Sequence, residues 1–353
     1  MSLTKWFPWT ASPVICNGPM LGAATPALAT EVSKAGGIGF LASIFDLSKG
    51  SAQLSALDTE LSESEPSRIG ISFITGDASA ALFSQTALPI IAKHRPAAVW
   101  LFAQAERTRL HLAFIRALRN LDPAPRVFVQ IGNVEAAREA ASDGAHVLVC
   151  QGIDAGGHQF RRGAGVISLV PEVCEMLKNE FPDRQVAVLA AGGIVDERGV
   201  VAAMALGADG VVMGTRFTVA RESVYPEHRK QQILQTADGA VSTLKAPFHD
   251  EIKSSALWGP LYDGRAIIGP VHLQFMSGSS LDECKKMLQE NYSTDEATQM
   301  LSTWAGTGVG LVKRQQPAGE VVVETDVHVG IRTTPASLPM HCRRYKYRAH
   351  DAD

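Results

Sequence analysis

The sequence has little of what marks a secreted, membrane-spanning or zinc-binding protein. Its five cysteines are scattered and form no C-x-x-C pair, so neither a disulfide framework nor a zinc site of common spacing is expected. The N-terminal segment MSLTKWFPWTASPV carries one lysine and no apolar core, unlike a signal or transit peptide. No apolar run approaches the roughly 18 residues of a membrane span. These absences predict a cytoplasmic protein with reduced thiols.

An excess of charge of one sign and the common catalytic motifs are also lacking. With 33 basic and 36 acidic residues the formal net charge is −3, which gives no general attraction to nucleic acid or to an anionic membrane. We therefore expect neither as a partner. The motifs H-E-x-x-H, the P-loop and G-x-S-x-G are absent, so metal catalysis, phosphoryl transfer and serine-hydrolase chemistry have no support, and no metal site is expected.

What the chain does contain is a regular alternation of two patterns. Eight short apolar runs, rich in β-branched residues, alternate with stretches of helical character. Such alternation predicts a parallel sheet covered by helices. Eight units within about 200 residues favour the α/β fold of a (β/α)8 TIM barrel over a doubly wound sheet. The apolar runs are Val14–Asn17, Gly37–Leu41, Arg68–Thr75, Ala97–Ala103, Arg126–Gly132, His146–Gly152, Val186–Gly192 and Gly210–Thr215. The helical stretches between them are Pro26–Ala35, Ala78–Lys93, Arg107–Asn120, Val134–Ser142, Leu169–Asn179 and Glu197–Leu206.

The pattern changes from about residue 223, which suggests a division of the chain. We expect residues 1–222 to form the barrel and residues 223–330 to form a mostly helical region that covers the substrate site. This region is expected to return to the barrel near residues 304–312. Its segments are two helical stretches and a loop-rich stretch between them, Glu227–Thr236, Leu281–Tyr292 and Lys245–Gly278. Residues 331–353 are expected to form a basic C-terminal tail that carries Arg343, Arg344, Lys346 and Arg348.

Glycine pairs follow the last two apolar runs, where the chemistry of a TIM barrel is found. Gly192-Gly193 follows the seventh run and Gly214-Thr215 follows the eighth. Glycine lets backbone N–H groups approach an anion, and the loops after strands seven and eight of a barrel commonly hold a phosphate. Either pair alone is equally well explained by a tight turn or a helix cap. Both together, at consecutive strand ends, predict a phosphorylated ligand.

His158 ends a glycine-rich segment, Gln151-Gly-Ile-Asp-Ala-Gly-Gly-His158, that follows the sixth apolar run. Of the ten histidines it is the one that stands beside a glycine-rich strand end. An imidazole in that place can take or give a proton near neutral pH, and we predict that it is catalytic. Three aromatic residues further along, Trp258, Tyr262 and Trp304, are candidates for a pocket wall, although core packing is the commoner fate of such residues.

Several motifs occur together in a fixed order along the chain. They are Pro13–Met20, Gly36–Gly39, Val129-Gln130, Gln151–His158, Ala191–Ile194 and Met213–Phe217, followed by Trp304–Gly310. This series resembles the nitronate monooxygenase family, formerly called 2-nitropropane dioxygenases. The combination of Ala-Gly-Gly-His, Ala-Gly-Gly-Ile and Gly-Thr is specific to the superfamily and less specific to any one reaction.

The resemblance implies a TIM barrel that binds FMN without a covalent bond, with His158 as the catalytic base. The phosphate would lie against the glycine-bearing loops, while Gly18-Pro19-Met20 and Gln130 would lie along the flavin ring. One departure is Ser72, where relatives commonly have asparagine, and the shorter hydroxyl side chain is expected to alter a flavin contact. The expected cofactor-binding residues are Gly18, Pro19, Met20, Ser72, Gln130, Gln151, Ala155, Gly156, Gly157, Ala191, Gly192, Gly193, Met213, Gly214 and Thr215.

The activity implied by the resemblance is the FMN-dependent oxidation of alkyl nitronates or nitroalkanes by O2 to a carbonyl compound and nitrite. The expected partners are thus a small-molecule substrate and O2, and a homodimer is left open. Two alternatives remain at this point. The same motifs occur in NAD(P)H-dependent quinone and enoyl reductases, and a tailoring dehydrogenase is conceivable on this scaffold. A flavin-binding protein without enzymatic activity is the other alternative.

Overall fold

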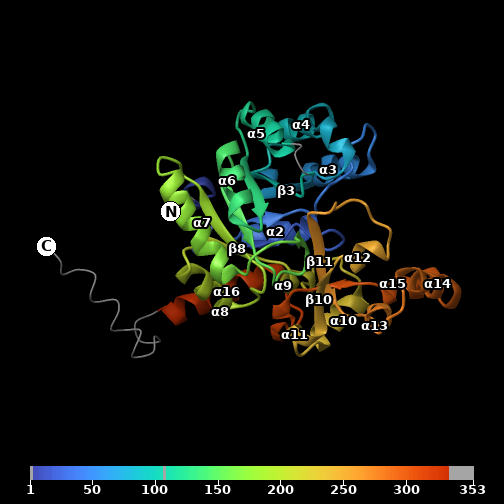
Figure 1. Ribbon diagram of the computed structural model, residues 1–353. Helices are drawn as coiled ribbons and strands as arrows, with labels where there is room; N and C mark the ends of the chain where they lie inside the picture. The colour runs from blue at the N-terminus through green and yellow to red at the C-terminus, as the bar shows by residue number, and fades with distance from the viewer. Residues whose placement is uncertain (1–2, 106–108, 334–353) are drawn as a thin grey trace.

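The computed structural model describes residues 3–105 and 109–333, and its centre is an eight-stranded parallel barrel (Figure 1). The strands follow the order β1-β9-β8-β6-β5-β4-β3-β2, and a parallel bridge between Cys16 and Ile38 joins the two ends of this series. The predicted TIM barrel is confirmed, and each of the eight apolar runs contains a barrel strand. These strands are β1 (Val14–Asn17), β2 (Gly39–Phe40), β3 (Ile69–Ile74), β4 (Ala98–Phe102), β5 (Arg126–Ile131), β6 (Val147–Gln151), β8 (Ala187–Ala191) and β9 (Gly210–Met213).

Helices between consecutive strands cover the barrel, as the alternation predicts. They bury apolar faces against the outward side chains of the strands, for example Phe73 and Val99. One helix, α3 (Ala52–Ser62), is missing from the sequence prediction, because only three leucines among polar residues mark its buried face. The predicted helix over Ala78–Lys93 divides into a 3₁₀ turn (Ala78–Leu82) and α4. The other helices are α2 (Pro26–Lys34), α4 (Phe83–His94), α5 (Leu110–Arg119), α6 (Val134–Asp143), α7 (Val166–Glu180) and α8 (Glu197–Ala205), with a 3₁₀ turn at Pro66–Arg68.

Aromatic side chains fill the interior of the barrel toward the amino ends of its strands. The rings of Phe40, Trp100 and Phe128 meet inside the barrel, with Phe40 lying 5.1 Å from Trp100 and 5.2 Å from Phe128 between centroids. Helix α1 (Leu3–Trp6) and the buried Phe7 close the opposite end, where Phe7 contacts Phe128. Bulky side chains of this kind make the interior of a TIM barrel a packed core.

Beyond the eighth barrel strand the chain forms a second, smaller sheet on one side of the barrel (Figure 1). Strands β10 (Thr243–Ala246), β11 (Tyr262–Ile267) and β12 (Thr303–Trp304) pair antiparallel, and β7 (Gly157–Phe160) joins β11 from the loop after β6. This sheet differs from the mostly helical region expected from the sequence, because its strands are short and lack a clear alternation. The accompanying helices are α9 (Thr215–Thr218), α10 (Glu227–Gln235), α11 (Gly239–Ser242), α12 (Phe248–Glu251), α13 (Pro270–Met276), α14 (Leu281–Asn291) and α15 (Thr294–Met300), with a 3₁₀ turn at Thr307–Leu311.

The last described helix, α16 (Ala318–Thr333), packs against α2 and α8 on the outside of the barrel (Figure 1). Its side chains Ala318, Val321 and Val322 belong to the same apolar core as the barrel helices. The helix therefore covers the outside of the barrel after β9. The expected division of the chain places residues 318–330 of this helix in the covering region and residues 331–333 in the basic tail. The rest of the basic tail, residues 334–353, lies outside the described residues. Among the helices of the described part, none is both long and apolar enough to cross a membrane.

Candidate active site

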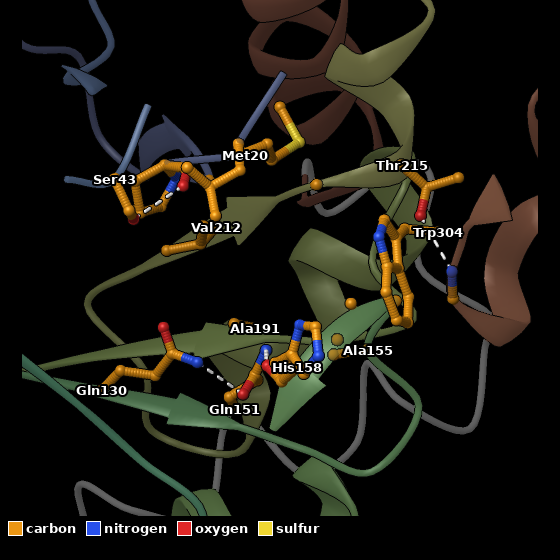
Figure 2. Close-up of a pocket in the computed structure, with 18 of the residues that line it drawn as sticks. Met20, Ser43, Gln130, Gln151, Ala155, His158, Ala191, Val212, Thr215 and Trp304 are labelled. Carbon is orange, nitrogen blue, oxygen red and sulfur yellow. Dashed lines mark hydrogen bonds between the residues drawn. The ribbon is translucent and has the colours of Figure 1, made fainter. Parts of the chain in front are cut away.

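A cavity of about 320 Å³ opens at the carboxyl ends of the barrel strands. Strand residues such as Ile74, Phe102 and Ala191 form its floor, and residues 250–258 of the covering region form part of its wall. Figure 2 shows Met20, Ser43 and Val212 on one side of the open space and Gln130, Gln151 and His158 on the other. Its size falls in the range of small-molecule and cofactor sites.

Most of the residues predicted from the sequence lie together around this cavity. The glycine corners, the two glutamines and His158 come from different strand ends, and the barrel brings them to one rim. The predicted residues that line the cavity are Gly18, Pro19, Met20, Gln130, Gln151, Ala155, Gly156, Gly157, His158, Ala191, Gly192, Gly193, Gly214 and Thr215.

Two of the predicted residues, Ser72 and Met213, do not reach the cavity. Ser72 is fully buried in β3, and its hydroxyl lies 2.9 Å from the hydroxyl of Ser43, which does line the cavity. Met213 packs outward into the core beneath the helices, while the preceding Val212 points inward. Because side chains alternate along a strand, Val212 faces the barrel interior when Met213 faces outward. The backbone carbonyl of Met213 still accepts a hydrogen bond from Gly18 N at 2.9 Å.

The His158 imidazole is enclosed at the cavity wall. Its ring stacks on Trp258 with 3.6 Å between centroids and lies 4.7 Å from the ring of Trp304. Its Nε2 lies 2.8 Å from a carboxylate oxygen of Asp250 in α12. Burial lowers the pKa of the His158 imidazole, and the hydrogen bond with Asp250 opposes part of that shift. Burial therefore favours the neutral form of the ring, which can accept a proton.

A chain of amide hydrogen bonds connects the barrel interior to the backbone of His158. Trp100 Nε1 donates to Gln130 Oε1 at 3.2 Å, and Gln130 Nε2 donates to Gln151 Oε1 at 2.6 Å. Gln151 Nε2 in turn donates to the carbonyl of His158 at 3.1 Å. Each amide is oriented by the preceding donor, so the strand that carries His158 is fixed relative to the cavity floor.

The segment 304–310 approaches the barrel loops so closely that only glycine fits at the contacts. A Cβ on Gly156 would overlap the backbone of Ala305, and a Cβ on Gly308 would lie 2.5 Å from the carbonyl oxygen of Gly193. These close approaches make the late segment part of the cavity wall, and they explain the glycines in both places.

The glycine corners also leave room for a ligand. A Cβ on Gly157 would meet nothing within 4 Å, and one on Gly214 would meet only Met20 Sδ at 3.9 Å. Gly192 and Gly193 adopt φ angles of 104° and 73°, which side chains other than glycine rarely tolerate. Both Gly157 and Gly214 line the cavity, and the space beside them is open. Because no side chain covers the backbone at these glycines, the phosphate of a cofactor could approach their N–H groups closely.

Several lining residues escaped the sequence analysis. Asp250 and Lys253 stand in no recognisable motif, and only the fold of the covering region brings them to the cavity. Ser43 follows the second barrel strand, so the strand-end rule applied to that run would have found it. Trp258 and Trp304 had been weighed as pocket residues, and both line the cavity. Tyr262 is buried beside it and donates a hydrogen bond to the carbonyl of Gln104 at 3.1 Å.

Comparisons with known proteins point to one family. The family model described as nitronate monooxygenase matches residues 85–325. A nitronate monooxygenase of Neurospora crassa is 45% identical, with 91% of this chain and 90% of that protein covered. A nitronate monooxygenase of Metarhizium robertsii is 35% identical, with 92% and 93% covered. A bacterial relative of the same name, from Pseudomonas aeruginosa, is 32% identical over 59% of this chain.

Solved structures agree with the fold. FabK from Thermotoga maritima superposes with a TM-score of 0.73 at 22% identity and covers 98% of both chains. A nitroalkane oxidase from Streptomyces ansochromogenes superposes with a TM-score of 0.70 at 21% identity, covering 95% of this chain and all of that one. At this level of identity the likeness supports the barrel with its covering region and carries no argument about the reaction.

Proposed function

The chain belongs to the nitronate monooxygenase family, and from this premise we propose that it oxidises alkyl nitronates and nitroalkanes with O2, using FMN, to a carbonyl compound and nitrite. As a member of this family it is an oxidoreductase. The observation that carries the proposal is the placement of the enclosed imidazole of His158 together with several glycine corners around one cavity.

We assign the anionic end of the cofactor to the loops around Gly157, Gly193 and Gly214. The open space above Gly157 and Gly214 supports this assignment. We assign Met20 and Gln130, on opposite sides of the cavity (Figure 2), to the flavin ring. When bound, FMN supplies the redox chemistry between the nitronate and O2, which no side chain of the cavity can perform.

His158 is the proposed base for neutral nitroalkanes. Its imidazole removes the proton from the carbon that bears the nitro group, which produces the nitronate anion. The indole rings of Trp258 and Trp304 keep water away from the imidazole, so that it remains neutral and ready to accept a proton. Lys253, whose Nζ lies 5.1 Å above the ring of Trp304, supplies positive charge at the cavity wall for the anion.

The test is a visible spectrum of the purified protein, followed by oxygen consumption and nitrite release with ethyl nitronate and nitroethane. The expected result is a flavin spectrum and turnover of both substrates. The matched variant is His158→Asn, which should keep the flavin spectrum and lose turnover of nitroethane by about 100-fold or more. A protein that binds no flavin after reconstitution contradicts the proposal.

Anaerobic reduction separates the proposed activity from the reductase alternative. Rapid bleaching of the flavin by NADH or NADPH, without any response to ethyl nitronate, would favour a quinone or enoyl reductase. Bleaching by the nitronate with no response to either nucleotide favours the oxidation proposed here.

A further inference from the structure

The side chain of Asp250 makes a direct hydrogen bond to the imidazole of His158, although 92 residues separate the two in the chain. Asp250 belongs to α12 of the covering region, while His158 belongs to β7 after the sixth barrel strand. Both side chains are largely enclosed, with exposed fractions of 15% for Asp250 and 10% for His158. A hydrogen bond to a carboxylate in such an enclosed place is stronger than one in water.

The contact determines which nitrogen of the imidazole carries the proton. A carboxylate oxygen only accepts hydrogen bonds, so Nε2 must be the N–H donor at 2.8 Å. In a neutral ring Nδ1 is then the acceptor. Among the described residues no side chain or backbone group forms a hydrogen bond with Nδ1. The basic nitrogen thus has no hydrogen-bond partner among the described residues, as transfer of a substrate proton to it requires.

We propose that Asp250 is a positioning residue that equips His158 to deprotonate neutral nitroalkanes, as distinct from nitronates that are already ionised. This inference rests on the proposed function. In the step, the C–H bond beside the nitro group breaks and its electron pair forms the C=N bond of the nitronate, while the π pair of one N=O bond moves to that oxygen, which takes the negative charge. The proton forms an N–H bond at Nδ1 of His158, which becomes an imidazolium, and the charge of Asp250 stabilises that cation.

The other charged groups near His158 are less suited to this role. Asp263, on β11, is engaged by Lys245 in an ion pair of 2.5 Å. Lys253 is a cation and disfavours the imidazolium. The stacked indole of Trp258 fixes the plane of the imidazole ring but contributes no charge. Asp250 is therefore the group that both orients the imidazole and stabilises its protonated form.

The first experiment compares substrates. The variants are Asp250→Asn, which removes the charge and keeps the shape, and Asp250→Ala; the control is Glu251→Gln, a neighbouring exposed carboxylate of the same helix. We expect kcat/KM for nitroethane to fall at least about tenfold in both Asp250 variants, while kcat/KM for ethyl nitronate changes less than about threefold. The control should match the wild type. Equal losses with both substrates, or no loss with nitroethane, would overturn the inference.

The second experiment reads the imidazole directly and does not depend on turnover. In the flavin-loaded protein with ¹⁵N-labelled histidine, the ring nitrogen shifts of His158, assigned with His158→Asn, should show the Nε2–H tautomer. Asp250→Ala should shift this ring toward a mixture of tautomers. A predominantly Nδ1–H ring in the wild type, or no change in Asp250→Ala, contradicts the role of Asp250. If the wild type binds flavin but oxidises neither substrate, the proposed function fails, and the tautomer still decides the role of Asp250.

Discussion

The indole of Trp258 lies parallel to the imidazole of His158, with 3.6 Å between the ring centroids and 10° between the planes. The two residues come from different parts of the fold, since Trp258 belongs to the covering region and His158 to the strand after β6. The stack removes one face of the imidazole from water. It thus links the conformation of residues 250–258 to the chemistry of the barrel.

Removal of the stacked indole should change the pH dependence of activity. Burial lowers the pKa of His158, and Trp258→Ala admits water and reduces this effect. The pKa of the imidazole should therefore rise. Since the base must be neutral to act, the acidic limb of the profile of kcat/KM for nitroethane should move to higher pH, as measured by nitrite release between pH 5 and 9.

The control for this change is Trp6→Ala, at the other end of the barrel, where Trp6 contacts His146. This variant should keep the acidic limb of the wild type. A limb that stays in place in Trp258→Ala, or moves to lower pH, would show that the indole does not control the hydration of His158.

Cofactor binding should be sensitive to side chains at Gly214. A valine there would extend into the cavity, where Met20 Sδ at 3.9 Å is the one neighbour within reach of its Cβ. Gly214→Val should therefore fold normally and bind FMN about 10 to 100 times more weakly, the effect of about 1–3 kcal/mol of overpacking. Fluorescence titration with FMN and thermal unfolding of the apoprotein measure the two effects.

Gly165→Val is the matched control, because a Cβ at Gly165 meets nothing within 4 Å and this residue lies outside the cavity lining. It should bind FMN as the wild type does. Unchanged affinity in Gly214→Val would remove this corner from the cofactor site.

Acid should destabilise the fold through buried neutral histidines. Burial lowers the pKa of His111 to about 3, below the value of about 6.5 in an unfolded chain. The unfolded state therefore binds more protons between these values, and the free energy of unfolding should fall as the pH decreases from about 6.5 toward 3. His111 contributes at most about 1.4 kcal/mol per pH unit to this slope.

Urea unfolding at several pH values tests this contribution. His111→Gln should show a shallower loss of stability on acidification, although its stability at pH 7 falls because the hydrogen bond to Thr75 is altered. The exposed His228 provides the control, and His228→Gln should follow the wild-type curve. An identical slope in His111→Gln would contradict the prediction.

Helix α16 should be necessary for the stability of the barrel. Val322 is 2% exposed in the barrel core, while its neighbour Val323 is 51% exposed. An aspartate at position 322 would bury an unpaired charge, so Val322→Asp should lower the free energy of unfolding by about 3 kcal/mol or more. Val323→Asp should change it by less than about 0.5 kcal/mol. Similar losses in both variants would show that α16 does not pack as a barrel helix.

The sequence was sufficient for the features that repeat or that depend on local backbone. The eight barrel strands could be read from their apolar runs, because strands buried on both faces are almost continuously hydrophobic. The glycine corners and His158 could be placed at one rim, because the carboxyl ends of the strands of a TIM barrel meet at the same face. The side chains of Met213 and Ser72 stay outside the cavity lining for different reasons: Met213 points outward into the core, while Ser72 is fully buried with its hydroxyl against that of Ser43.

By itself, then, the sequence determined the barrel, its active face and most of the cavity rim, because periodicity and glycine are local signals. Only the tertiary structure decided the partners of His158. Asp250 and Trp258 lie in a region whose strands are short and whose helices are brief, and no spacing relates them to the barrel motifs. Their contacts with the imidazole arise from long-range packing, which a pattern along the chain does not encode. The position of α16 was also decided by the tertiary structure, because this helix follows the covering region in the chain and yet packs against α2 and α8 of the barrel.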